Sequence, residues 1–181
     1  MQRRKTNSYK INGNITIIYI TNRKKETFEC LIDTKNLNKV IDLSWHIRYD
    51  PNTNGYYVAH KEYLKDENGK RKSHTIEIHS LLMGSKIGKY FTDHINNNGL
   101  DNREENLRIC SNKQNTSHRK SRNKNNKTGY RNVCFFNDWY IIQLQINGKN
   151  KVVGRTKNLE DAGKIAEEMR LKYYGEFAGK N

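Results

Sequence analysis

Apolar residues are too sparse in this chain to build one large core. Hydrophobic side chains make up 34% of its 181 residues, and the mean hydropathy is −1.05. A chain of this length can hold one domain or two small ones. We therefore expect small sub-domains that either pack around modest cores or lie on the surface of a partner.

The N-terminal residues and the lengths of the apolar runs allow an expectation about the cellular location of the protein. No apolar run approaches the roughly 20 residues that a membrane-spanning helix needs. The N-terminus is basic and polar, without an apolar stretch of signal-peptide type. These features predict a soluble cytoplasmic protein that is not secreted and has no membrane partner.

Positive charge is concentrated toward the C-terminus. The formal net charge is +15, and residues 111–181 hold fifteen Lys and Arg against six Asp and Glu. Such an excess is typical of a protein with a polyanionic partner; the alternative is a basic linker that is merely solvated. No acidic residue stands between Glu105 and Asp138, and the cations in that gap include Lys113, Arg119, Lys120, Arg122, Lys124, Lys127 and Arg131.

The three cysteines predict neither a disulfide framework nor a zinc site. Cys30, Cys110 and Cys134 are isolated and odd in number, and none belongs to a paired ligand spacing. We expect reduced thiols and no structural zinc.

The segment from Asp93 to Asn115 combines groups that suit phosphodiester hydrolysis. Asp93 directly precedes His94, and the following stretch is rich in Asn, Gly and Asp, as in compact loops. Mg²⁺ prefers oxygen ligands and keeps several waters, so one carboxylate and the amide of Asn115 could bind it together with phosphate oxygens. A histidine that is neutral near pH 7 can take a proton from an attacking water. An Asp-His pair alone carries little information, but the full pattern DH-x₅-LDN-x₃-NLR-x₅-QN is far more specific.

This pattern resembles that of the HNH (His-Me finger) nucleases, in the branch whose last position is Asn, and of phage or intron-encoded homing endonucleases in particular. The resemblance implies a ββα-metal motif over about residues 88–118. Its first strand would be Tyr90 to His94, and its second Leu107 to Cys110. Ser111 would cap the short helix that carries Asn115.

The same resemblance implies the roles of the site residues. His94 would be the general base, while Asp93 and Asn115 would bind one Mg²⁺ or Mn²⁺ ion. Asn106 would pin the loop and so orient His94, and Arg108 could touch phosphate. His79 stands in Ile78–Leu82, where related nucleases carry His-Arg-Leu; it either joins the site or has a structural role.

The region before the motif is β-rich and contains no catalytic constellation. Similar regions precede the motif in many phage-type members of the nuclease family, so the resemblance implies one nuclease domain over residues 1–115. The patterns of β-branched and aromatic residues and the turn signals predict three strands, a fourth apolar segment of strand type and a short helix. The predicted strands are Ile15–Thr21, Thr27–Ile32 and Tyr56–Tyr63; the apolar segment is Thr75–Leu82, and the helix is Asn36–Leu43.

A polar basic linker over residues 116–128 separates this domain from a second one over residues 129–181. Alternation predicts strands at Tyr130–Phe136 and Trp139–Ile146, and Asn147-Gly148 is a strong hairpin turn leading to a third strand. Asn158 can cap an amphipathic helix that Gly175 ends. The prediction is a small three-stranded antiparallel sheet packed on one helix.

About fifty residues of this second domain resemble the DNA-binding domain of plant ethylene-response (APETALA-type) factors. The matching stretches are Gly129–Val133, Asn147–Lys149, Val153-Gly154 and Tyr174–Ala178. In that family the sheet face opposite the helix enters the major groove, where Arg can read guanine and Gln can read adenine. The resemblance implies a face of Arg131, Trp139, Gln143, Gln145, Lys151 and Arg155.

Together these patterns predict an α+β protein: a metal-dependent endonuclease that cuts double-stranded DNA to 5′-phosphate and 3′-hydroxyl ends. A monomer would nick one strand and a homodimer could cut both. Beside the site, Arg119, Lys120 and Arg122 of the linker would contact the DNA backbone. The alternative is a non-catalytic, sequence-specific DNA-binding regulator on a nuclease scaffold; a third interpretation is a nucleic-acid chaperone that uses only the basic linker.

Overall fold

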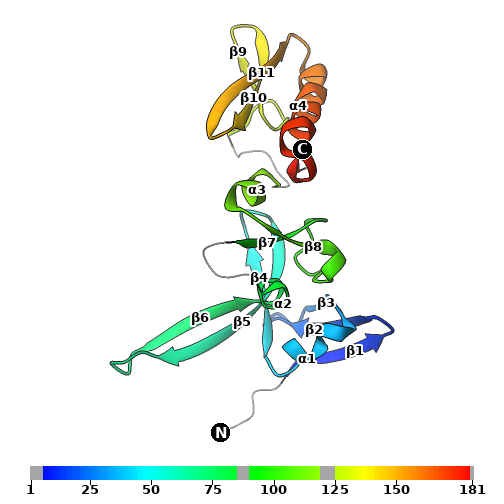
Figure 1. Cartoon of the computed structure of the whole chain (residues 1–181), viewed down its shortest axis with the longest axis vertical. Coiled ribbons are helices and arrows are strands. Elements are labelled where there is room, and N and C mark those ends of the chain that lie inside the picture. Colours follow the sequence, from blue (N-terminus) through cyan, green and yellow to red (C-terminus); the bar gives the residue numbers. More distant parts are fainter. Residues whose placement is uncertain (1–5, 85–89, 119–124, 180–181) are drawn as a thin grey trace. The chain divides into compact units, whose positions relative to one another are not determined.

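The computed structural model describes residues 6–84, 90–118 and 125–179. It is α+β, with small antiparallel sheets and short helices (Figure 1). The chain divides into two compact units, Met1–Ser111 and Asn112–Asn181. The division comes directly after the second strand of the predicted nuclease motif, whereas the sequence placed the end of the first domain at Asn115.

The first unit begins with a sheet of order β1-β2-β3, formed by β1 (Ser8–Asn12), β2 (Ile15–Thr21) and β3 (Thr27–Asp33). Strand β2 alternates between buried and half-buried residues, because one of its faces covers a core. A short η1 (Thr34–Asn36) runs into α1 (Leu37–Val40), within the segment predicted as a helix.

A second sheet has the order β4-β5-β6, with β4 (Trp45–Asp50), β5 (Gly55–Lys65) and β6 (Arg71–Glu77). The apolar segment Thr75–Leu82 is not one strand: β6 ends at Glu77, and α2 (Ile78–Met83) follows. Ile78 and Leu82 are four residues apart, so one helical face places both in the core. Gly84 ends the helix in the left-handed conformation.

The core of the first unit is built from these two sheets and the helices that follow them. The buried indole of Trp45 has a hydrogen-bond partner inside this core, because its Nε1 donates to the Val40 carbonyl at 2.9 Å. The buried members are Ile18, Ile20, Cys30, Ile32, Leu37, Val40, Trp45, Val58, Ile78 and Leu82.

A hairpin completes the first unit. Strand β7 (Phe91–His94) pairs antiparallel with β8 (Leu107–Cys110), and η2 (Glu104–Asn106) directly precedes β8. The helix α3 (Asn112–Ser117) follows β8 in sequence and opens the second unit. The predicted strand-loop-strand-helix order is therefore present along the chain.

The second unit has a sheet of order β11-β10-β9, formed by β9 (Val133–Phe136), β10 (Trp139–Ile146) and β11 (Lys149–Thr156). The helix α4 (Leu159–Tyr174) packs on it, and η3 (Gly175–Phe177) follows. Asn158 is the N-cap as predicted: its side chain accepts from the amides of Glu160 and Asp161. The small core contains Val133, Ile142, Ala162 and Ala166.

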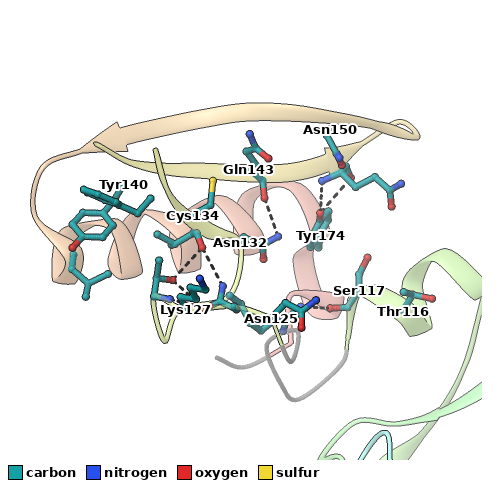
Figure 2. A pocket seen from close by; sticks show the side chains of 17 residues that line it. Thr116, Ser117, Asn125, Lys127, Asn132, Cys134, Tyr140, Gln143, Asn150 and Tyr174 are labelled. Carbon is teal, nitrogen blue, oxygen red and sulfur yellow. Dashed lines mark hydrogen bonds between the residues drawn. The ribbon is translucent and has the colours of Figure 1, made fainter. Parts of the chain in front are cut away.

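Strand β9 is shorter than predicted, and side chains replace it along the rest of β10 (Figure 2). Asn132 accepts from the Gln143 amide through its backbone oxygen at 2.8 Å and donates its Nδ2 to the Gln143 carbonyl at 2.9 Å. The Tyr174 hydroxyl likewise accepts from the Gln145 amide and donates to its carbonyl. These contacts satisfy a strand edge that would otherwise be open.

None of the described helices is long and apolar enough to cross a membrane.

Candidate functional site

The β7–β8 hairpin holds Asp93 and His94 side by side at the end of a strand. In the register of the hairpin, Asp93 lies opposite Arg108 and His94 opposite Leu107. Both side chains are nearly buried, with exposed fractions of 8% for Asp93 and 6% for His94. A carboxylate and an imidazole are thus withdrawn from bulk water together.

Asn106 fastens the loop that follows His94. Its Oδ1 accepts from the Asn96 amide at 2.9 Å, and its Nδ2 donates to the Asp101 carbonyl at 2.7 Å. The Asn106 carbonyl accepts from the Ile95 amide at 2.9 Å. The two side-chain bonds and this backbone bond close the loop. Pinning the loop is the role that the resemblance implied for the Asn106 side chain.

The far side of the loop is tied to the first sheet. The Leu31 amide donates to the Leu100 carbonyl at 2.9 Å, and the Leu31 carbonyl accepts from the Asn102 amide at 2.7 Å. Gly99 packs so closely on β5 that an added Cβ would lie 2.4 Å from the Tyr56 carbonyl oxygen. The loop is therefore held between the two sheets, which fixes the position of its side chains.

Asn102 contacts His94 directly, a role that the sequence did not assign to it. Its Oδ1 lies 3.1 Å from His94 Nε2. Its Nδ2 donates to the Gly99 carbonyl and to Cys30 Sγ, both at 3.3 Å, so Oδ1 is the acceptor toward the histidine. The hydrogen-bond network thus assigns the proton to Nε2 and leaves the lone pair on Nδ1.

Two further rings surround His94. The ring centroids of His79 and His94 are 4.9 Å apart, and those of Tyr57 and His94 are 6.0 Å apart. The contact places His79 at the site, which was one of its two predicted roles. Burial lowers the pKa of His94, and burial together with the charge of His94 lowers the pKa of His79 to about 3. Both imidazoles are accordingly neutral at pH 7.

Arg108 lies against Asp93 instead of presenting its guanidinium to solvent. Its Nε donates to Asp93 Oδ2 at 2.9 Å, and its Nη2 is 2.8 Å from the same oxygen. Only 11% of the Arg108 side chain is exposed. Arg108 thus holds the carboxylate that precedes His94, and its contact with phosphate stays a prediction.

Asp93 brings one carboxylate to the hairpin, and carboxylate oxygens are ligands that a hard divalent cation prefers. Among the described residues, no three or more His, Cys, Asp and Glu side chains form a group that could hold a metal. An ion at Asp93 would therefore have few protein ligands there, and Mg²⁺ is bound in that way because it keeps waters and accepts phosphate oxygens.

The remaining members of the predicted site lie in the second unit or outside the described part of the chain. Asn115 is on α3, so its meeting with Asp93 around one ion stays a prediction. Arg119, Lys120 and Arg122 lie outside the described residues.

A second group of predicted residues shares the face of the second sheet opposite α4. Gln143 and Gln145 are exposed and alternate with the buried Ile142 and Leu144. Trp139 lies two residues before Ile141, which pairs with Arg155 across the sheet. The Trp139 ring has cations on it: Arg155 Cζ and Lys157 Nζ each lie 5.2 Å from its centroid.

Two residues predicted for this face are elsewhere. Arg131 is 3% exposed, and its guanidinium donates to the carbonyls of Ser117 and Ala178. Arg131 precedes β9 and bonds to these backbone carbonyls within the unit, so the prediction that it reads DNA is wrong. Lys151 pairs with the buried Leu144 and so belongs to the face that carries the helix. The pairing of β10 with β11 shifts register between Ile142 and Gln143 because of a β-bulge. Lys151 and Arg155 therefore lie on opposite faces of the sheet.

The second unit also has a hollow of about 950 Å³ beside the open part of β10 (Figure 2). Polar side chains line it, including Asn132 before β9, Gln143 on β10 and Tyr174 at the end of α4. The Asn132 Nδ2 and the Tyr174 hydroxyl bond to the backbone of β10.

A comparison with curated proteins supports the nuclease prediction. The chain is similar to an uncharacterized HNH endonuclease of Acanthamoeba polyphaga mimivirus, with 27% identity over 169 residues. The similarity covers 92% of this chain and 82% of that protein, so it includes most of both units. No family model matches the chain, and no solved structure matches it significantly. The similarity supports a nuclease at the level of the HNH family, and the ethylene-response resemblance of the second unit stays a prediction.

Proposed function

We propose that this protein is a metal-dependent HNH DNA endonuclease of the homing type that hydrolyses phosphodiester bonds to 5′-phosphate and 3′-hydroxyl ends. The observation that carries the proposal is the buried Asp93-His94 pair, in which Asn102 fixes the histidine tautomer. Binding DNA alone requires neither a buried carboxylate beside a neutral imidazole nor a partner that orients the ring.

His94 is the general base of the proposed reaction. Its Nε2 proton is held by Asn102, and Nδ1 takes the proton from the water that attacks the phosphorus. Because the pKa of His94 lies below its ordinary value, the ring is ready to accept a proton at neutral pH. Asn106 and Asn102 keep the loop and the ring in place and do not touch the reacting atoms.

Asp93 and Asn115 would hold the metal ion. When bound, Mg²⁺ or Mn²⁺ polarises the scissile phosphate and stabilises the charge that develops on the leaving 3′ oxygen. Arg108 holds the Asp93 carboxylate in position through its two nitrogen contacts.

The second unit would supply affinity and selectivity for DNA. Its exposed face combines amide side chains that can read base edges with a cation-flanked tryptophan. The basic linker residues Arg119, Lys120 and Arg122 would add backbone contacts.

Nicking of supercoiled plasmid in the presence of Mg²⁺ or Mn²⁺ tests the proposal. We expect open-circular product from the wild-type protein and none in excess chelator. Linear product at low conversion would indicate that two copies cut both strands. Absence of any cut on plasmid, and on genomic DNA of the source organism, would favour a DNA-binding regulator and reject the nuclease.

The pH dependence of the nicking rate reports the environment of His94. Its pKa is lowered by burial, so we expect the acidic limb of the rate profile to lie below pH 6.5. Asn102→Asp would place a carboxylate at His94 Nε2, stabilise the imidazolium and raise its pKa, so the limb should move to higher pH. The measurement is the single-turnover rate from pH 4.5 to 9 at saturating Mg²⁺.

The control for this prediction is Asn98→Asp. Asn98 is exposed in the same loop, and its Oδ1 caps the Leu100 amide, which a carboxylate can also do. This variant should keep the wild-type profile. An Asn102→Asp profile that coincides with the wild type would contradict the assignment of Asn102 to His94.

The proposed DNA face of the second unit predicts different effects from two matched cation deletions. Arg155→Ala removes a guanidinium from the Trp139 face, whereas Lys164→Ala removes an exposed charge from α4 on the opposite side. We expect Arg155→Ala to weaken binding by about 1–3 kcal/mol, the range for removing a side chain that bonds a base edge in the groove. Lys164→Ala should bind as the wild type does in equilibrium titrations; equal effects of the two variants would place the DNA elsewhere.

A further inference from the structure

Strands β5 and β6 continue as a two-stranded ribbon beyond the sheet that they share with β4. Pairing with β4 stops at His60, while β5 and β6 remain paired out to Lys65 and Arg71. Figure 1 shows this ribbon projecting from the other elements of the first unit. Tyr63 and Leu64 are 54% and 53% exposed there, so the ribbon has no core of its own. An isolated hairpin of this kind is marginally stable in water, and a partner would stabilise it.

The two faces of the ribbon differ in charge. Residues paired across an antiparallel ladder share a face, and the pairs Lys61–Thr75, Tyr63–Ser73 and Lys65–Arg71 define one of them. We call these six residues the arm face. It carries three cations, an aromatic ring and two hydroxyls, all exposed, and no acidic residue. The opposite face carries Glu62, Leu64, Lys72 and His74.

The arm face is continuous with the candidate active site. Going inward along β5, the residues of the same face are Ala59 and Tyr57. The Tyr57 ring contacts His94 and His79, with centroids 6.0 and 6.3 Å away, and Arg48 lies 5.1 Å over it. One strand face therefore leads from the catalytic histidine to the cations near the tip.

We infer that the arm face binds the phosphate backbone of duplex DNA on one side of the scissile phosphate. The inference rests on the proposed nuclease function. At about 3.3 Å per residue, Tyr63 and Lys65 lie roughly 20 and 26 Å from Tyr57 along the strand. Since duplex DNA rises about 3.4 Å per base pair, the contacts fall about six to eight base pairs from the cut. A two-stranded ribbon fits the major groove, so its cations can reach the phosphates at the groove edge.

The test compares two variants of the full chain that each lack three charges. The first carries Lys61→Gln, Lys65→Gln and Arg71→Gln on the arm face. The matched control carries Lys10→Gln, Lys39→Gln and Lys72→Gln, at exposed positions of the same unit outside that face. Binding to a duplex is titrated over a salt series, and a duplex that contains the mapped nick is footprinted with hydroxyl radicals. Thermal melting checks that both variants fold.

For the arm-face variant we expect the slope of log Kd against log salt to fall by about 2.7, since each phosphate that a cation no longer neutralises lowers the slope by about 0.9. Protection should also disappear about six to eight base pairs to one side of the nick. The control variant should keep both the slope and the protection. An arm-face variant that keeps both the slope and the protection would overturn the inference and point to a protein partner for the ribbon. A control whose slope falls as much would also overturn it, because the loss would then not be specific to the arm face.

Failure of this inference can be told apart from failure of the nuclease proposal. Wild-type protein that nicks plasmid while the arm-face variant binds unchanged would reject the ribbon contact alone. Wild-type protein that binds duplex without nicking would reject the nuclease, and the salt slope would still decide whether the ribbon touches DNA.

Discussion

Replacing His94 with alanine is expected to lower the nicking rate by roughly 10²- to 10⁴-fold, the usual contribution of a general base. The imidazole is buried, and Asn102 aligns it through Nε2, so no neighbouring group can take over its position. His79 is close, but burial lowers its pKa and makes it a weaker base. The measurement is the single-turnover rate on supercoiled plasmid at saturating metal and protein.

Chemical rescue separates a base from a structural residue. Truncation at His94 leaves a cavity beside Asn102 that imidazole in the buffer can enter, so added imidazole should restore part of the rate in proportion to its unprotonated form. A second comparison uses Asp93→Asn against Asp42→Asn, which makes the same change at an exposed carboxylate. Only the Asp93 change should abolish nicking. A rate that survives His94→Ala would remove this residue from the mechanism while leaving the metal ligands to be tested.

The local elements could be predicted from sequence where a single pattern determines them. Ile15–Thr21 and Trp139–Ile146 are strands at the predicted bounds because alternation and flanking turn residues agree. The Asn158 cap and the Gly175 end of α4 were also correct, since both depend on chemistry within a few residues. Strand β1 was not predicted, and it is exposed throughout.

The contacts of the candidate site depend on tertiary structure and could be predicted only in part. Asn106 bonds along its own loop, so a local motif suffices to assign it. Asn102 reaches His94 only because the loop is tied to Leu31 on a distant strand. His79 lies close to His94 from the helix α2, in which Ile78 and Leu82 are buried. The sequence pattern of this segment had favoured a strand instead.

The two incorrect DNA contacts in the second unit have local physical causes. The resemblance implied that both residues lie on the exposed sheet face, but Arg131 precedes β9 and a bulge in the β10–β11 pairing shifts Lys151 to the other face. Neither feature has a signal in the residues themselves, since Arg and Lys suit exposed and half-buried positions equally. Gln143 and Gln145 are on β10, and Arg155 pairs with Ile141 of the same strand. All three lie on one face of the sheet, as expected.

Gly99→Ala is expected to damage the site without touching any group that reacts. A Cβ at this position would lie 2.4 Å from the Tyr56 carbonyl oxygen and 2.6 Å from the Tyr57 ring, and a backbone atom cannot swing away as a side chain can. The loop must therefore move off β5. We expect the free energy of unfolding to fall by about 1–3 kcal/mol, as in other overpacked sites.

The effect of Gly99→Ala on the rate should be larger than this decrease in stability suggests. The Gly99 carbonyl accepts from Asn102 Nδ2, so moving the loop displaces the residue that aligns His94. A shift of about 1 Å in such an arrangement can cost about 10²-fold in rate. Gly55→Ala is the matched control, because its Cβ would meet the Thr53 hydroxyl at 3.3 Å and no backbone atom closer than 3.9 Å. If Gly99→Ala kept the wild-type nicking rate at a temperature where it is fully folded, the placement of His94 would not depend on this loop, and its alignment would have to come from β7 alone.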